Sequence, residues 1–258
     1  MFDQSLRIVA DGMEILGRPR ESAPVEGAYV GPGGFTGWED GGGEVRREAV
    51  PRPAAIGEFD LPVYEGAMVF SVDGHALASS PQRLAVLRDR ITGVGSGGRR
   101  FQVAVELQGR TLWTTARRGA RPSFKDAGIR GGLIRASFLL QFVAPIPRKY
   151  GATREVPAGQ VAINRGNEDA VPRLLIGAGT GGYTITGPAG RVITVTTAPA
   201  GAHYIDFVNG GLFTAAGARQ VGAISTYQPW SIPPGAIGVT ASITGARSLS
   251  QVYADTFN

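Results

Sequence analysis

The chain of 258 residues contains no cysteine, two histidines and only two lysines. The lack of cysteine excludes disulfides and thiolate zinc sites, so cysteine usage indicates no redox compartment. His75 and His203 lie far apart in the sequence, and we interpret each as a structural or surface residue, not a metal ligand. No run approaches the ~18 consecutive apolar residues of a membrane-spanning helix, and no basic-then-apolar segment opens the chain. We therefore expect a soluble protein with no membrane partner.

Sequence signatures of catalysis are also missing. The chain has no G-x-S-x-G elbow, no H-E-x-x-H pair and no P-loop. The glycines at 95–98 follow a predicted helix and precede a predicted strand, which is the reverse of the order in a phosphate-binding loop. Glu58 and Asp60 lie close together, but we interpret them as surface carboxylates because no buried cleft is indicated around them. The sequence predicts a protein that is not an enzyme and needs no catalytic residue, metal or cofactor.

Charge is unevenly distributed along the chain. Arginine supplies 24 of the 26 basic residues, a composition that suggests a GC-rich coding genome. Residues 1–80 carry a net charge of −7, residues 81–135 carry +9, and the remainder carries +3. An acidic segment followed by a basic one favours pairing of the two, within a protomer or between protomers. Aromatic residues are not concentrated among the arginines, so we do not expect sequence-specific nucleic-acid binding.

The composition favours many short strands. Gly at 39 and Pro at 17 interrupt a chain that is 43% hydrophobic, which is too apolar for disorder. Asp11-Gly12 predicts a hairpin turn, and Asp73-Gly74 predicts a second turn. Ser80 followed by Pro81 predicts the start of a helix that runs to Ile91. Residues 17–43 and 118–132 are predicted as glycine-rich loops.

Residues 136–151, ASFLLQFVAPIPRKYG, divide the chain. Apolar side chains occupy both faces of the predicted strand at 136–143, which indicates little contact with water. Pro145 and Pro147 then stop the strand and stiffen the connection. After residue 151 charge becomes sparse, and short strands alternate with turns without a helical pattern, as in an antiparallel sandwich. We predict two β-rich domains, residues 1–150 and 151–258.

Several segments, in this order, resemble the distal tail proteins of phages with long non-contractile tails. They are GWEDGGGEVRRE at 37–48, RPAAIGEFDLPVY at 52–64, the helix at 80–91 and FLLQFVAPIPRKYG at 138–151. The second half adds NRGNEDAVPRLLI at 164–176, GGYTITGP at 181–188 and YQPWSIPPG at 227–235. Together they span nearly the whole chain, and none is a catalytic signature.

The resemblance implies a mainly β protein with an N-terminal belt domain, related to tail-tube subunits and carrying one helix. It also implies a C-terminal galectin-like β-sandwich. Six copies would form a ring at the tail tip of the virion, joining the tail tube to the tail-tip hub. The implied partners are further copies of the chain, the tail tube protein, the hub protein, and receptor-binding or other minor tail proteins. Sugar-binding galectins use a strand histidine followed by an N-P-R turn. This chain has no N-P-R sequence, so the likeness implies the galectin fold without its sugar binding.

Two sets of residues are candidates for binding. We expect the subunit interface of a ring to use aromatic and basic side chains, namely Trp38, Arg99, Arg100, Arg117, Arg118 and Arg121. The other reading of Trp38 is that it covers its own protomer's core. An alternative function, host-surface glycan binding, would use Trp230 and Tyr227 as a stacking platform. Trp230 also fits a place in the core beneath its proline-rich loop, which is the reading we favour.

Overall fold

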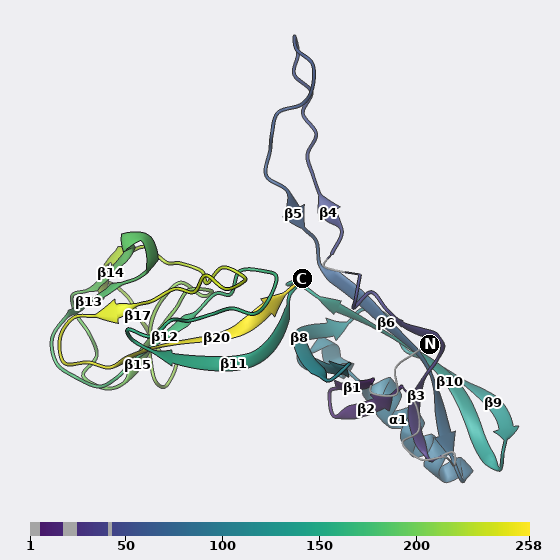
Figure 1. The fold of residues 1–258 in the computed structure, drawn as a ribbon. Coiled ribbons are helices and arrows are strands. Elements are labelled where there is room, and N and C mark those ends of the chain that lie inside the picture. The colour runs from purple at the N-terminus through teal and green to yellow at the C-terminus, as the bar shows by residue number, and fades with distance from the viewer. Residues whose placement is uncertain (1–5, 18–24, 41–42) are drawn as a thin grey trace. The chain divides into compact units, whose positions relative to one another are not determined.

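The computed structural model describes residues 6–17, 25–40 and 43–258. The chain is mainly β, as predicted, and its described part contains one α-helix. It divides into two compact units. Unit 1 comprises residues 1–149 and Asn258, and unit 2 comprises residues 150–257. Figure 1 labels the elements of both, and each unit is described by itself below.

Unit 1 is built on a sheet that closes on itself. Its strands pair in the order β8-β7-β1-β2-β3-β6-β10, and β10 pairs again with β8. A further strand, β9, extends the sheet beyond β10. The bounds are β1 Arg7–Ala10, β2 Met13–Leu16, β3 Gly27–Thr36, β6 Met68–Ala78, β7 Phe101–Leu107, β8 Arg110–Arg118, β9 Ser123–Arg130 and β10 Leu133–Ala144. Alternate residues of these strands point into one apolar core.

Two of the tight hairpins of unit 1 follow from their turn residues. Asp11 and Gly12 join β1 to β2 with φ of 51° and 78°. Gln108 and Gly109 join β7 to β8 with φ of 52° and 75°. Positive φ at both central positions is the conformation that matches the twist of the flanking strands. The predicted hairpin at Asp11-Gly12 is confirmed.

The predicted turn at Asp73-Gly74 is wrong, because β6 runs straight through it as the partner of β10. Gly74 lies opposite Phe138 in the register of the two strands. A Cβ on Gly74 would lie 2.3 Å from the Phe138 ring and 2.6 Å from the Tyr29 carbonyl oxygen. The glycine therefore makes room for a core phenylalanine, and its backbone stays extended.

The predicted helix is confirmed as α1, Pro81–Gly93. The Ser80 hydroxyl accepts a hydrogen bond from the Arg83 backbone N–H, and Pro81 occupies the first turn. Leu84 and Ile91 are buried in the core of unit 1, and the helix contacts β6, β9 and β10. A 3₁₀ turn, Ser96–Gly98, then leads to β7.

Two segments predicted as loops contain strands. The loop prediction for 17–43 falls partly outside the described residues, and within it lies β3. The register of β3 against β6 shifts between Val30 and Phe35. Gly31 and Gly33 fit this irregular stretch because a Cβ at either position would collide with His75 or Asp73 of β6. The loop predicted at 118–132 holds β9, which pairs with β10.

Unit 2 consists of two antiparallel sheets with a shared core. One sheet has the order β17-β16-β15-β12-β20-β11 and the other β18-β14-β13-β19. Their buried side chains form a single cluster that includes Leu174, Ile205, Ile185 and Ile193. The bounds are β11 Lys149–Pro157, β12 Arg173–Ile176, β13 Tyr183–Thr186, β14 Val192–Val195, β15 His203–Asp206, β16 Gly211–Thr214, β17 Arg219–Gln220, β18 Ile224–Tyr227, β19 Ser242–Ile243 and β20 Leu249–Phe257, with a 3₁₀ turn at Pro188–Gly190.

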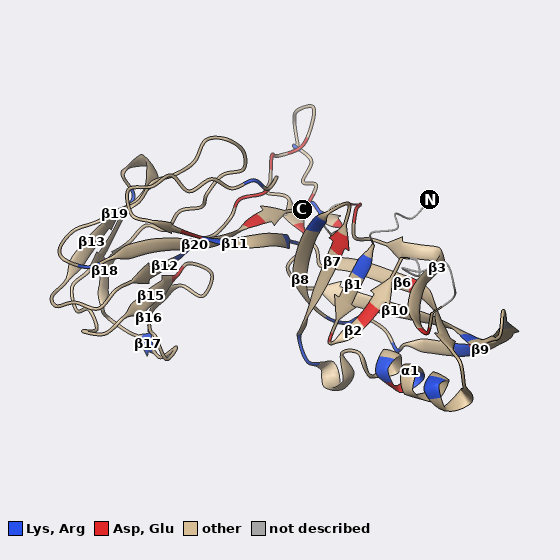
Figure 2. Cartoon of the chain, turned by 60° about the horizontal axis from the view of Figure 1, so that its bottom comes forward, with Lys and Arg blue, Asp and Glu red and all other residues tan. Residues whose placement is uncertain are grey.

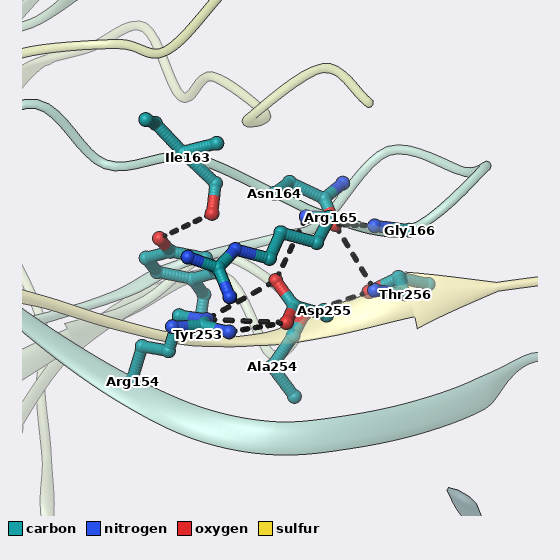
Figure 3. A network of polar contacts seen from close by, with 9 residues as sticks. All are labelled: Arg154, Ile163, Asn164, Arg165, Gly166, Tyr253, Ala254, Asp255 and Thr256. Atoms are coloured by element: carbon teal, nitrogen blue, oxygen red, sulfur yellow. Dashed lines mark hydrogen bonds and ion pairs between the residues drawn. The ribbon is translucent and has the colours of Figure 1, made fainter. Parts of the chain in front are cut away.

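A buried polar network fastens the loop at 163–168 to β20 (Figure 3). Asn164, which is fully buried, donates to the carbonyl oxygens of Glu168 and Ile232 and accepts from the N–H groups of Gly166 and Thr256. Asp255 accepts from the Arg154 guanidinium and from the Arg165 N–H. Burial alone raises the pKa of Asp255, but the bonds from Arg154 and Arg165 outweigh it, so the pKa lies below its ordinary value. All of these hydrogen bonds are made within unit 2, so we assign the network a structural role.

Candidate interaction surfaces

A long hairpin of unit 1, which we call the arm, comprises residues 43–66. At its base, β4 (Val45–Arg46) pairs with β5 (Tyr64–Glu65), and the Gly66 N–H donates to the Glu44 carbonyl oxygen at 2.7 Å. Nearer the tip, the Phe59 N–H donates to the Val50 carbonyl oxygen, and the Arg52 N–H donates to the Gly57 carbonyl oxygen. Figure 1 shows the arm leaving the sheet as a two-stranded projection.

The arm exposes apolar side chains along its whole length. Ile56 at the tip is fully exposed, and the other large apolar residues with substantial exposure are Val45, Val50, Phe59, Val63 and Tyr64. The two chains of the arm are joined by an ion pair between Arg47 and Glu58 at 2.5 Å, and the Arg52 guanidinium lies over the Phe59 ring. An isolated two-stranded hairpin is marginal in water, so this element is typical of a segment that packs against a partner.

A second surface of unit 1 is an apolar groove between α1 and β9, which we call the α1–β9 groove. It has a volume of about 270 Å³. Leu84 and Ala85 of α1 form one wall, and Phe124 and Ile129 of β9 form the other. Ile129 is 75% exposed. Figure 2 marks the basic residues of α1 in blue, and Arg88 lines the groove.

Three of the arginines predicted to contact a neighbouring subunit are engaged within unit 1. Arg99 forms an ion pair with Asp11 at 2.6 Å. Arg118 donates to the carbonyl oxygens of Thr92 and Val94 and so binds the end of α1, where such carbonyls lack helical partners. Arg117 donates to the Gly98 carbonyl oxygen. Arg118 is partly buried by these bonds, whereas Arg99, Arg100, Arg117 and Arg121 are exposed, so their contact with a neighbouring subunit stays a prediction.

The charge separation along the sequence is partly neutralised inside unit 1. Arg99 of the basic segment meets Asp11 of the acidic segment, and Arg83 of α1 meets Glu26. Hydrogen bonds from Ser79 and Arg83 lower the pKa of Glu26 to about 2. Pairing within a protomer therefore accounts for part of the pattern.

Trp38 belongs to the core of its own protomer, so its prediction as an interface anchor is corrected. It is 1% exposed and packs edge-on against Phe70, with ring centres 5.2 Å apart. Its carbonyl oxygen accepts a hydrogen bond from Lys149. A tryptophan buried in this way offers no surface to a neighbouring subunit.

Trp230 is likewise a core residue, so its prediction as a glycan contact is corrected. It is 5% exposed, its Nε1–H donates to Gln251 at 3.2 Å, and its ring packs against Phe207 and the Gly187 backbone. Tyr227 is 37% exposed and meets Phe207 edge-on. The structure does not bring Trp230 and Tyr227 together as an open platform.

The two histidines are held by polar neighbours within their own units. The Nε2 atom of His203 lies 2.8 Å from the Tyr183 hydroxyl, and its Nδ1 lies 2.9 Å from the Gly201 carbonyl oxygen. Arg135 approaches the His75 ring at 3.1 Å. Burial lowers the pKa of both histidines. The described residues contain no group of three or more side chains arranged to hold a metal ion.

The described part of the chain contains no helix long and apolar enough to cross a membrane. Two surfaces of unit 1 expose apolar side chains and are the features best suited to binding a protein partner, namely the arm and the α1–β9 groove. Sequence reasoning missed both. The alternating apolar residues at 59, 61 and 63 were a signal of the arm in the sequence, but the groove depends on a strand, β9, that was predicted as a loop.

The sequence matches no protein-family model and no curated protein. Among solved structures, the chain is similar to the SPP1 Dit protein, described as a paradigm of the hub adsorption apparatus in phages that infect Gram-positive bacteria. The TM-score is 0.67 at 14% identity, covering 98% of this chain and 99% of that one. A chain of the phage P2 baseplate, in its activated conformation with Ca, gives 0.48 at 7% identity, with 96% and 97% covered. The chain therefore has the fold of the SPP1 Dit protein over nearly its whole length.

Proposed function

We propose that this chain is a structural, non-catalytic protein of a phage tail tip, in which six copies form a ring between the tail tube and the tail-tip hub. The arm carries this proposal. It exposes apolar side chains that no core of its own unit covers, as expected of an element that packs on a neighbouring subunit. The shared fold with SPP1 Dit supports the same conclusion.

The two units have different roles in this proposal. Unit 1 is the belt domain that forms the ring, and unit 2 is a galectin-like sandwich presented by it. The partners of the ring are then the tail tube protein on one side and the hub protein on the other, with receptor-binding or other minor tail proteins as further contacts. The virion tail tip is the expected location, and the GC-rich host stays a prediction from composition.

Glycan binding by unit 2 is not retained as a second candidate. The prediction depended on a stacking platform formed by Trp230 and Tyr227, and Trp230 is in the core.

The test compares the full chain with a variant that lacks most of the arm. Residues 47–63 are replaced by Asn-Gly, which joins β4 to β5 through a two-residue turn suited to their pairing. By light scattering, we expect the full chain to assemble toward six copies of 27.0 kDa and the shortened variant to remain a monomer with an unchanged circular dichroism spectrum. Equal assembly of the two variants would refute the role of the arm, and a full chain that stays monomeric at high concentration would refute the ring.

Ionic strength gives a second readout. We expect ring association to weaken as salt is added, since exposed ion pairs are screened over ~10 Å at ~0.1 M salt. Reversal of the exposed Arg100 and Arg121 to Glu should weaken association further. Reversal of Arg118 instead disturbs the fold, because this residue binds the end of α1.

A further inference from the structure

The open edge of β9 is suited to binding an extended polypeptide. Among the described strands, β9 pairs on one side only, with β10. Its other edge therefore presents backbone N–H and C=O groups over eight residues. Such an edge recruits a further strand, with main-chain hydrogen bonds supplying affinity and side-chain pockets supplying specificity.

The α1–β9 groove supplies the pocket. It lies beside the same strand, and most of its lining is apolar, namely Leu84, Ala85, Phe124, Ile129 and Ile134, with Arg88 and Asp126 as the two charged members. A strand added at the β9 edge would place alternate side chains over this groove, because residues i, i+2 and i+4 share one face. The matching ligand is an extended chain with apolar residues at alternate positions.

The arm has this pattern. Phe59, Leu61 and Val63 alternate with Asp60, Pro62 and Tyr64, and Phe59 and Val63 are about half exposed. The two charged residues that line the groove, Arg88 and Asp126, cancel, so the electrostatic attraction comes from the net charges of the two elements. Residues 43–66 hold five acidic and three basic residues, a net of −2, whereas α1 holds three arginines and one aspartate, a net of +2. Within one chain the arm is exposed and the groove is open.

From these features we infer that the arm of one copy lies along the β9 edge of a second copy and seats Phe59, Leu61 and Val63 in its α1–β9 groove. The inference rests on the proposed ring and names the surface that receives the arm. It makes each unit 1 both donor and acceptor, which is a head-to-tail contact of the kind that forms a ring when the rotation between copies closes.

Disulfide trapping tests the contact directly, because the chain has no cysteine of its own. Three double variants combine Ile129→Cys with Ile56→Cys, Phe59→Cys or Val63→Cys. Under mild oxidation, we expect at least one of them to give reducible, covalently linked multimers. Mixing the two single variants of that pair should give a linked dimer between copies. The matched control pairs Phe59→Cys with Val221→Cys, an exposed position of unit 2, and should give no link above background.

A pair of surface variants separates the receiving site from the ring itself. Ile129→Lys places a charge on the β9 wall of the α1–β9 groove, whereas Val86→Lys places one on α1 in a different groove, which Glu26 also lines. We expect the first to shift the light-scattering mass to the monomer and the second to leave it unchanged. Rings that persist in Ile129→Lys, with no link from any double variant, would overturn the site and leave the ring standing. A monomeric parent chain without links would overturn both.

Discussion

The Lys149 ammonium donates a hydrogen bond of 2.7 Å to the carbonyl oxygen of Trp38, across 111 positions of the chain. The nitrogen also lies 5.8 Å from the centre of the Trp38 ring. Lys149 is 5% exposed, and burial lowers its pKa. The pair joins the start of β11 to the loop after β3, so this buried charged residue stabilises unit 1.

Replacing Lys149 with Met should therefore destabilise the protein. The variant leaves the Trp38 carbonyl oxygen without its partner, which costs about 1–3 kcal/mol in the free energy of unfolding. The chain offers a matched control in its other lysine, Lys125, which is exposed. Lys125→Met should change stability by less than ~0.5 kcal/mol. Denaturant unfolding compares the two, and equal midpoints would contradict the structural role of Lys149.

Arg118 should matter for stability because it binds the end of α1. Removing its guanidinium leaves the carbonyl oxygens of Thr92 and Val94 without their donor. We expect Arg118→Ala to lower the free energy of unfolding by about 1–3 kcal/mol and to speed hydrogen exchange in the last turn of the helix. Arg100→Ala is the control, since Arg100 is exposed nearby. A helix whose exchange is unchanged in Arg118→Ala would count against this assignment.

Glu26 should make the stability of the fold depend on pH in the acidic range. Its pKa of about 2 in the fold lies below the ordinary value, so its contribution is complete above the ordinary pKa and is lost as pH falls toward 2. Glu26→Gln should thus melt lower than the parent at pH 6, and the difference should shrink between pH 5 and 2. Glu48→Gln, on the exposed arm, should match the parent throughout. A difference for Glu26→Gln that stays constant over this range would show that the carboxylate is not the cause.

Local signals predicted the elements that depend on local chemistry. Ser80 and Pro81 define α1 because a cap is satisfied within one turn, and Asp11-Gly12 defines a hairpin because positive φ suits those residues. Gly74 was wrongly predicted as a turn residue. A glycine is needed there because the ring of Phe138, 64 positions later, fills the space of a side chain, and no local pattern reveals this. The glycines of β3 were misread in the same way, since Asp73 and His75 occupy the space above them.

The candidate surfaces were harder to predict because they depend on tertiary neighbours. The pairing of Arg99 with Asp11 and the burial of Trp38 need the closed sheet, and sequence alone left both free to face a partner. The sequence does not mark β20 as a strand, although Asp255 and Thr256 within it bind the loop at 163–168. Polar residues in a buried strand hide it from a search for alternating apolar positions.

Gly166 should tolerate no side chain, because the carbonyl oxygen of Thr256 lies where a Cβ would be. That Cβ would be 1.7 Å from the oxygen, and the neighbouring atoms are backbone that cannot swing aside. Its φ is not in the left-handed region, so only space requires glycine. We expect Gly166→Ala to break the network of Figure 3 and destabilise unit 2 by about 3 kcal/mol, the upper end of the usual cost of overpacking. Gly201→Ala is the control, since nothing lies within 4 Å of its Cβ position. Differential scanning calorimetry of the two variants decides the matter, and a Gly166→Ala protein that melts like Gly201→Ala would show that the loop is not packed against β20.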